Sequence, residues 1–196
     1  MPNVLCIEGR ITDKGYESRY IKCVGLDEFM YAYRTDLERF IEKTRFYIKK
    51  YFTPDEDTLI PFKVTDQFIN VFGEVYPDRA ESMRISNIDA LFSNMKLGED
   101  CKVYAFDYEW VFDFPVPYKY VIWRAAKEIY YQYQAYLKRK ISQEQFLERI
   151  GFEKTEIAIY RKMEESFAFF VYGADRCEKY TSHYVKRSVM QEIRFC

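Results

Sequence analysis

The chain lacks several features that mark membrane, secreted and nucleic-acid-binding proteins. No apolar run approaches the length of a membrane-spanning helix, and the opening "MPNVLCIEGR" has neither the basic segment nor the apolar stretch of a secretory signal. The 30 basic and 31 acidic residues give a net charge of −1, without the positive excess typical of nucleic-acid binding. These absences predict a cytoplasmic protein with no membrane span and no nucleic-acid partner.

Histidine and cysteine are too few and too scattered for the sites they usually build. The single histidine, His183, has no serine or cysteine nucleophile motif nearby, and the five cysteines form no Cys-x-x-Cys pair. A histidine-based triad, a disulfide framework and a zinc knuckle are therefore not expected. Reduced and mostly buried thiols are expected instead.

The chain does hold ample material for a core. Its 196 residues are 48% hydrophobic and 31% charged, which is typical of one folded domain or one large lobe of a bigger protein. Hydrophobic periodicity predicts a mainly helical α+β fold. The expected order is short strands over 3–11 and 18–25, helices over 26–33, 35–53 and 65–73, a hairpin over 94–110, and helices over 117–140, 142–151 and 155–173.

Capping residues set the expected helix starts. Thr35 with Glu38, and Ser142 with Gln145, have the spacing of capping boxes, and Thr155 is expected to open the last helix. The apolar stripes of these helices predict a buried core made of Leu37, Phe40, Ile41, Ile48, Val121, Ile122, Ile129, Tyr160, Met163, Phe167 and Phe170.

The stretch "RISNIDALFSNMKLGEDCKVYAFDYEW", residues 84–110, raises a question of function. It places Asp89, then Asn94 five residues on, then Asp107 after a predicted hairpin. One interpretation is ordinary surface loops with the acids in solvent. The other is a phosphate-and-metal site, because the hairpin can fold Asp107 back beside the loop and because carboxylate and amide oxygens suit magnesium.

This stretch resembles the catalytic segment of aminoglycoside phosphotransferase and choline-kinase-like proteins. Those carry His-Gly-Asp, an Asn five residues after the Asp, and a strand ending in Ile-Asp-Trp/Tyr-Glu, which "NIDALFSN" and "AFDYEW" match. It is similar, more closely, to kinase-like modules of bacterial surface-polysaccharide glycosyltransferase and methyltransferase proteins. Their "NIDxxFSN…DYEWxFxFPVP" run continues here as "VFDFPVPYKYVIWR", and the resemblance covers roughly residues 19–173.

The resemblance implies a protein-kinase-like large lobe with a catalytic-loop β-hairpin and only a remnant of the small lobe. Residues 1–24 would be remnant small-lobe strands and the hinge, and residues 25–173 the large lobe. Residues 174–196 would be a C-terminal tail, whose apolar residues suggest a partly docked helix.

The resemblance also implies a chemistry, which is transfer of a phosphoryl group from ATP, with Mg²⁺, to a hydroxyl of a small molecule or sugar. Asp89 would be the catalytic base, and Asn94 and Asp107 the metal ligands. These two ligands and Glu109 would form the cofactor-binding set. Such crowding of acids is expected to raise the pKa of at least one carboxyl group.

Two departures from the family pattern keep a second function open. Asn87 stands where the family has histidine, and nothing before residue 20 supplies a glycine-rich phosphate loop, a strand lysine or its partner glutamate. The chain is then either a fragment of a longer protein or a non-catalytic, pseudokinase-like module. Such a module would bind a nucleotide, a glycan, or a neighbouring glycosyltransferase or methyltransferase domain in a cell-surface polysaccharide system.

Overall fold

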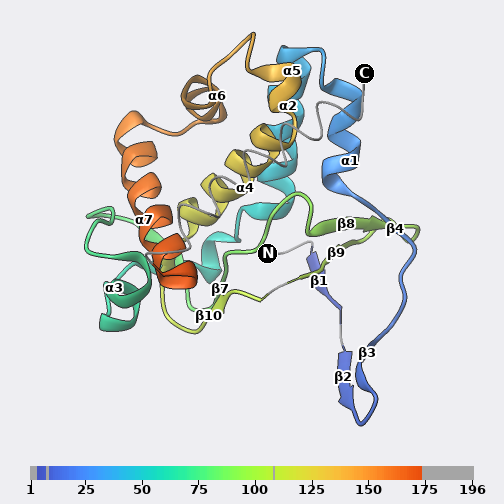
Figure 1. Cartoon of the computed structure of the whole chain (residues 1–196), viewed down its shortest axis with the longest axis horizontal. Coiled ribbons are helices and arrows are strands. Elements are labelled where there is room, and N and C mark those ends of the chain that lie inside the picture. The colour runs from blue at the N-terminus through green and yellow to red at the C-terminus, as the bar shows by residue number, and fades with distance from the viewer. Residues whose placement is uncertain (1–3, 8, 108, 174–196) are drawn as a thin grey trace.

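The fold is α+β, with a helical body and a small mixed sheet at one side of it (Figure 1). The computed structural model describes residues 4–7, 9–107 and 109–173. The tail helix expected over 174–196, and His183 within it, lie outside the described residues. No helix in the described part of the chain is both long and apolar enough to cross a membrane.

The helical elements are α1 (Leu26–Met30), η1 (Tyr31–Tyr33), α2 (Leu37–Tyr47), η2 (Ile48–Phe52), η3 (Glu56–Thr58), α3 (Asp66–Phe72), α4 (Tyr118–Gln132), α5 (Gln134–Leu137), α6 (Gln143–Ile150) and α7 (Lys154–Tyr172). The strands are β1 (Val4–Cys6), β2 (Gly9–Thr12), β3 (Gly15–Ser18), β4 (Cys23–Gly25), β5 (Ile60–Pro61), β6 (Glu81–Met83), β7 (Ser86–Asn87), β8 (Met95–Gly98), β9 (Val103–Ala105), β10 (Val111–Phe112) and β11 (Val116–Pro117).

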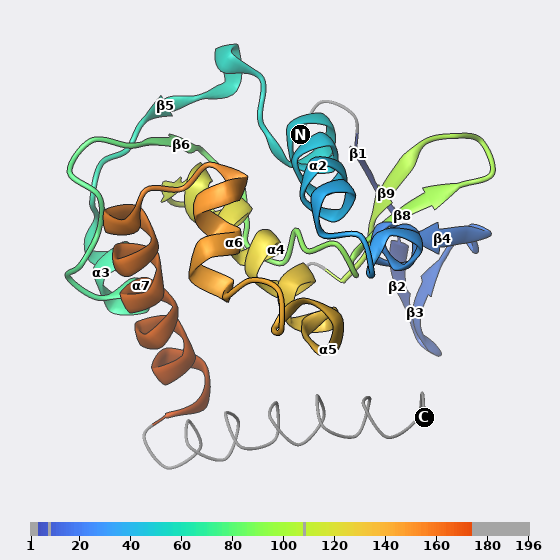
Figure 2. The same ribbon diagram turned by 90° about the horizontal axis from the view of Figure 1, so that it is seen from above.

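The largest sheet is built on the predicted hairpin. β8 and β9 pair antiparallel around the expected turn after Gly98, β4 adds antiparallel to β8, and β1 adds parallel to β9. β4 leads directly into α1, so the sheet is joined to the helical body by the chain itself. By contrast, the β2–β3 hairpin projects away from the body in both views (Figures 1 and 2), and its Ile11 is 89% exposed.

The helix starts follow the capping chemistry only in part. The Ser142–Gln145 capping box of α6 is confirmed. The Thr35–Glu38 box is wrong, because Asp36 is the N-cap of α2 and its carboxylate accepts the Arg39 N–H at 3.2 Å. Helix α7 also starts earlier than expected, at Lys154.

Thr155 lies inside α7 because a different pair caps this helix. Glu153 is the N-cap of α7, and its backbone N–H donates to Oε2 of Glu156 at 3.0 Å. The helix expected over 117–140 is interrupted at Tyr133, which contacts a residue far away in sequence. Tyr133 leaves helical geometry (φ −106°, ψ 16°), and its hydroxyl donates to the Asp27 carbonyl at 2.7 Å, so α4 and α5 are separate.

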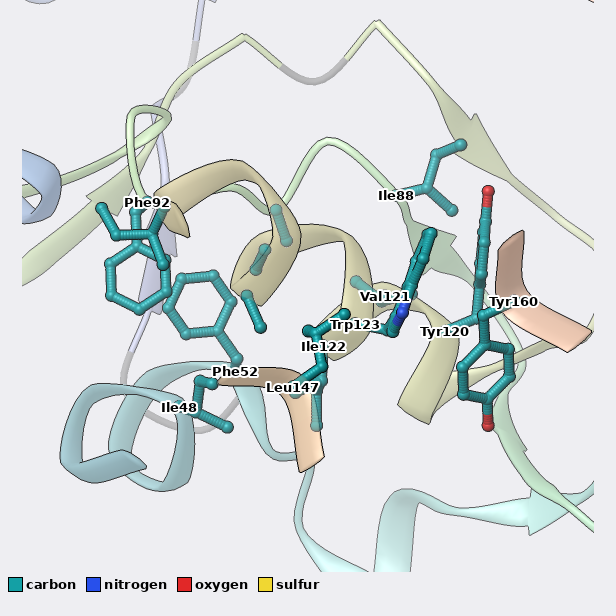
Figure 3. Packing of buried hydrophobic residues seen from close by; sticks show 14 of the residues in the cluster. Ile48, Phe52, Ile88, Phe92, Tyr120, Val121, Ile122, Trp123, Leu147 and Tyr160 are labelled. Carbon is teal, nitrogen blue, oxygen red and sulfur yellow. The ribbon is translucent and has the colours of Figure 1, made fainter. Parts of the chain in front are cut away.

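The core lies among α2, α4, α6 and α7 and is mostly the one predicted (Figures 2 and 3). Nine of the eleven expected residues are buried: Phe40, Ile41, Ile48, Val121, Ile122, Ile129, Tyr160, Met163 and Phe167. Leu37 is only partly buried, and the prediction for Phe170, which is 44% exposed, is wrong. The inward stripe of α7 continues from Phe167 to Val171, four residues on, which turns Phe170 outward.

The expectation of mostly buried thiols is also wrong for the described cysteines. Cys6 and Cys101 are exposed and Cys23 is half-buried. Cys6 ends β1, which lies at the edge of its sheet, and Cys101 lies in the hairpin turn with a left-handed φ of 62°. Neither position has a second layer of structure to cover it.

Candidate functional site

Two chain segments meet beside the pair formed by β7 and β10. The Asp89 loop (residues 87–94) runs from β7 to β8, and the Asp107 segment (residues 105–110) runs from β9 to β10. The Ile88 N–H donates to the Trp110 carbonyl at 3.1 Å, and the Phe106 N–H donates to the Asn94 carbonyl at 2.8 Å. Backbone hydrogen bonds therefore tie the two segments together near both ends.

The Asp89 loop is anchored by its apolar residues. Ile88, Ala90 and Phe92 alternate along the loop and are each at most 1% exposed. Phe92 stacks on Phe52 of η2 with ring centroids 4.9 Å apart, and Figure 3 shows both rings in the core beside α4. These anchors fix the backbone on either side of Asp89 while leaving Asp89 itself only partly buried.

Asn94 joins the two segments through its side chain. Its Nδ2 donates to the Asp89 carbonyl at 3.0 Å and to the Asp107 carbonyl at 3.3 Å. The structure thus brings the backbones of Asp89, Asn94 and Asp107 together. Because the amide nitrogen is used in this way, the Oδ1 atom of Asn94 is left as an acceptor facing the Ser93 hydroxyl at 3.4 Å.

Asp107 stands on the exposed side of this junction. It has a left-handed φ of 52°, which is uncommon outside glycine and concentrated at turns and functional sites. Glu109, two residues on, is also exposed. The charges of both acids act on Asp89, so the acidic residues of the prediction share one region of the surface.

Asp89 is held by three polar groups. Its Oδ2 accepts the Trp110 N–H at 2.8 Å, and its Oδ1 lies 3.7 Å from Nη1 of Arg124. Its own N–H donates to the Asn87 side-chain Oδ1 at 2.9 Å. Asn87 therefore has a structural role in shaping the loop.

The pKa of Asp89 is raised above its ordinary value, as the crowding of acids predicts, but for a different main reason. Burial raises the pKa most, while the Trp110 N–H and the Arg124 guanidinium lower it. The negative charges of Asp107 and Glu109 add a smaller upward effect. Desolvation of one carboxyl group outweighs its repulsion from the exposed acids.

A charged network behind Asp89 was not anticipated from the sequence. Arg124 of α4 donates from Nη1 to the Ile88 carbonyl at 2.6 Å and pairs through Nε with Oε2 of Glu164 at 2.9 Å. Lys127 reaches Oε1 of the same glutamate at 3.1 Å, and the Tyr120 hydroxyl donates to Oε2 at 2.7 Å. Burial alone would raise the pKa of Glu164, but the two cations bring it below its usual value.

A signal for this network was present in the sequence. Arg124 lies among Val121, Ile122 and Ala125, on a helix whose apolar pattern predicts burial. A charged residue in such a position needs a buried partner. Its partner, Glu164, lies forty residues away on α7. Nothing local in the sequence identifies that pairing, and only the packing of α7 against α4 creates it.

The oxygens of Asn94 and Asp107 are of a type that magnesium accepts, but they form no cluster that could hold a metal by protein alone. Within the described residues, no three His, Cys, Asp or Glu side chains are grouped so that they could hold a metal ion. Asn94 and Asp107 supply one amide oxygen and one carboxylate, both of them hard ligands. Magnesium is usually held by one or two carboxylates plus substrate phosphates and water, which these two residues can satisfy.

Comparison with known proteins leaves the site to be argued from its own geometry. The chain matches no protein-family model and no curated protein.

Proposed function

We propose that this protein is a kinase-like phosphotransferase large lobe. In this proposal it transfers the γ-phosphoryl group of ATP, with Mg²⁺, to a hydroxyl group of a small molecule or sugar. The observation that carries the proposal is the bridge made by Asn94, whose amide joins the carbonyls of Asp89 and Asp107. A base, an amide oxygen and a second carboxylate are the groups that phosphoryl transfer in a kinase-like site needs close together.

Asp89 has the role of the base in this proposal. Each oxygen of an ionised carboxylate has more than one lone pair, so the bond from the Trp110 N–H leaves acceptor capacity for a hydroxyl proton. Partial burial and the acids nearby raise its pKa, which favours proton acceptance. Arg124, at 3.7 Å, limits that rise in pKa.

Asn94 and Asp107 have the role of metal ligands, with Glu109 beside them on the nucleotide side. When bound, Mg²⁺ would neutralise the charge that develops on the phosphoryl oxygens. The exposed position of Asp107 and Glu109 leaves these acids open to a nucleotide from solvent. The anchored Asp89 loop keeps Asn94 in place because Phe92 and Met95 on either side of it are fully buried.

ATP turnover tests this proposal. We expect Mg²⁺-dependent phosphoryl transfer or ATP hydrolysis by the wild type, and loss of most turnover in Asp107→Ala and in Asp89→Asn. The asparagine at position 89 keeps an acceptor for the Trp110 N–H but cannot take a proton. Asp113→Asn, an exposed acid in the following loop, is the matched control. Equal turnover in wild type and Asp107→Ala would remove the proposal.

A second function, a non-catalytic binding module, is favoured by one observation. Both oxygens of Asp89 already face protein donors, Trp110 N–H at 2.8 Å and Arg124 at 3.7 Å, so the carboxylate has a structural role without any substrate. Such a module would bind a nucleotide, a glycan or a neighbouring glycosyltransferase or methyltransferase domain.

Thermal shift distinguishes the two functions. A rise in melting temperature with Mg²⁺–ATP, but no turnover, would favour the binding module with a nucleotide ligand. A rise with a sugar nucleotide alone would favour a glycan-related ligand. No rise with either would point to a protein partner.

A further inference from the structure

One face of the β8–β9 hairpin is turned away from the core. Met95 and Ala105, which pair across the hairpin, are both buried. Successive side chains of a strand point to opposite faces, so the neighbouring pair, Lys96 and Tyr104, lies on the other face, where both side chains are only partly buried. The hairpin therefore presents Lys96 on the side that the core does not cover.

The same face of the hairpin leads into the candidate site. The Phe106 N–H donates to the Asn94 carbonyl at 2.8 Å and extends the ladder of the hairpin by one further pair. By the same alternation, Asn94 and Phe106 belong to the face that carries Lys96. Asp107 directly follows Phe106 in the chain. Lys96 therefore shares its face with one proposed metal ligand and with the residue that precedes the other.

The ammonium group of Lys96 lies at the end of the hairpin that adjoins the site. Its Nζ is 5.1 Å from the centroid of the Phe106 ring, a distance at which a cation is attracted to an aromatic face. Within the described residues, no carboxylate forms an ion pair with Lys96, although Asp107 and Glu109 are exposed in the same region. The charge of Lys96 is thus not taken up by an acid of the protein and is open to an anion.

A polyphosphate would need such a cation, because the site is otherwise acidic. Asp89, Asp107 and Glu109 bring three carboxylates to this region. Phosphoryl-transfer sites hold the phosphates with a basic side chain as well as with metal ions, and lysine does so as a point charge. Arg124 is poorly placed for this task, because its side chain is only 13% exposed and pairs with Glu164 at 2.9 Å.

We propose that Lys96 is a phosphate-binding residue of the site. Its ammonium group contacts phosphoryl oxygens of a nucleotide polyphosphate whose Mg²⁺ is held by Asn94 and Asp107. In this way the hairpin supplies the phosphate-binding lysine that β1, β2, β3 and β4 lack. The inference rests on the proposed function, because it takes the ligand to be a nucleotide polyphosphate.

Variants of the full chain test this role, with inorganic tripolyphosphate as the probe. Lys96→Met removes the charge and keeps an apolar stem, Lys96→Gln is a second neutral variant, and Lys96→Arg keeps the charge. Lys102→Met is the matched control, because Lys102 is an exposed lysine at the turn of the same hairpin and its loss changes the net charge equally. Titration calorimetry gives the Kd for tripolyphosphate with Mg²⁺ and the Kd for Mn²⁺ alone.

We expect both neutral variants to bind tripolyphosphate about tenfold more weakly than the wild type, as loss of one charge-assisted hydrogen bond would cause. Lys96→Arg should restore most of the affinity, and Lys102→Met should bind like the wild type. Mn²⁺ alone should bind to Lys96→Met no more weakly than to the wild type, because an ammonium group repels a metal ion.

Several results would overturn the inference. Equal losses of affinity in Lys96→Met and Lys102→Met would show that only the overall charge matters. Wild-type affinity in both neutral variants, or a wild type that binds no tripolyphosphate, would show that Lys96 contacts no phosphate. Weaker binding of both tripolyphosphate and Mn²⁺ by Lys96→Met would show that the substitution disturbs the whole site.

The inference and the proposed function can fail separately. Tripolyphosphate binding that depends on Lys96, without any ATP turnover, would support the phosphate site and remove the phosphotransferase. ATP turnover with the same KM for ATP in the wild type and in Lys96→Met would support the phosphotransferase and remove Lys96 from its phosphate site.

Discussion

The two segments that meet at the candidate site are built in opposite ways. The Asp89 loop is anchored in the core by Ile88, Ala90 and Phe92, and helix α4 holds it from behind. The Asp107 segment presents Asp107 and Glu109 to solvent, with Asp107 in a left-handed backbone conformation, while its Ala105 is buried and its Trp110 half-buried. The anchored loop fixes the position of Asp89, whereas the charges of Asp107 and Glu109 are accessible from solvent.

This comparison predicts that the largest loss of stability comes from truncating a residue that anchors the Asp89 loop. Phe92→Ala should lower the free energy of unfolding by about 3–5 kcal/mol, because it empties a fully buried site that stacks on Phe52. Phe170→Ala, at a position 44% exposed, should cost much less. Urea denaturation measures both, and equal losses would contradict the assignment of Phe92 as an anchor.

The next largest effect is expected at the cation behind Asp89. Arg124→Ala leaves Glu164 and Asp89 without their shared partner, and breaking a buried pair is strongly destabilising. Lys127 still pairs with Glu164 at 3.1 Å in this variant. We therefore expect the free energy of unfolding to fall by about 3 kcal/mol, near the lower end of the range for breaking a buried ion pair.

A matched control for Arg124 exists on the surface. Arg149 pairs with Glu38 through two nitrogens at 2.9 and 2.5 Å, but these side chains are 40% and 73% exposed. Arg149→Ala should therefore lower the free energy of unfolding much less than Arg124→Ala does. If the two arginine variants unfold at the same urea concentration, burial does not set the strength of the Arg124 network.

A third effect is a dependence of folding stability on pH, which arises from Glu128 on α4. The pKa of Glu128 is about 8 in the folded protein against 4.5 as its ordinary value, because of burial and of Asp27 on α1. Between these two pH values the unfolded chain has lost a proton that the folded chain keeps. Raising the pH through this window therefore destabilises the folded state.

Glu128→Gln should remove most of that pH dependence. We expect the stability of the wild type to fall by roughly 1–3 kcal/mol more than that of the variant between pH 5 and pH 8. The groups facing Glu128 are Asp27, Ser93 and the Phe92 amide, none of which brings a positive charge. Urea midpoints at pH 5, 6.5 and 8 measure the effect, and parallel curves for the two proteins would contradict it.

Much of the fold could be predicted because the signals for it are local. Helical stripes placed nine of eleven core residues correctly, and the Ser142–Gln145 pair and the turn after Gly98 marked real boundaries. The errors in helix starts come from neighbouring residues that cap the helices instead, and one further error comes from a tertiary contact. Tyr133 breaks a continuous helix pattern because its hydroxyl binds the Asp27 carbonyl, which lies far away in sequence.

In the candidate site, too, the part with local signals could be predicted and the part that depends on distant residues could not. The spacing of Asp89, Asn94 and Asp107 around a hairpin was enough to expect their proximity, since a hairpin returns its end to its start. The groups that hold Asp89 were not expected, because Arg124 and Glu164 come from helices that follow the motif. Partners separated by long stretches of chain leave no periodic trace in a single sequence.

The smallest effect on stability is expected on the exposed half of the site. Asp107→Asn removes one of the weaker charges that raise the pKa of Asp89, so the metal-free variant should gain a few tenths of a kcal/mol and melt less than about 2 °C higher.

The same variant should have the largest effect on metal binding. Millimolar Mg²⁺ or Mn²⁺ should raise the melting temperature of the wild type, because an ion that binds the folded state stabilises it by mass action. Asp107→Asn should abolish most of that rise, since it removes the one carboxylate among the proposed ligands, while Asp113→Asn should keep it. If the wild type ignores both ions at low ionic strength, the exposed half is not a metal site, and the binding-module interpretation should be preferred. If Asp107→Asn responds like the wild type, the ion binds elsewhere on the protein.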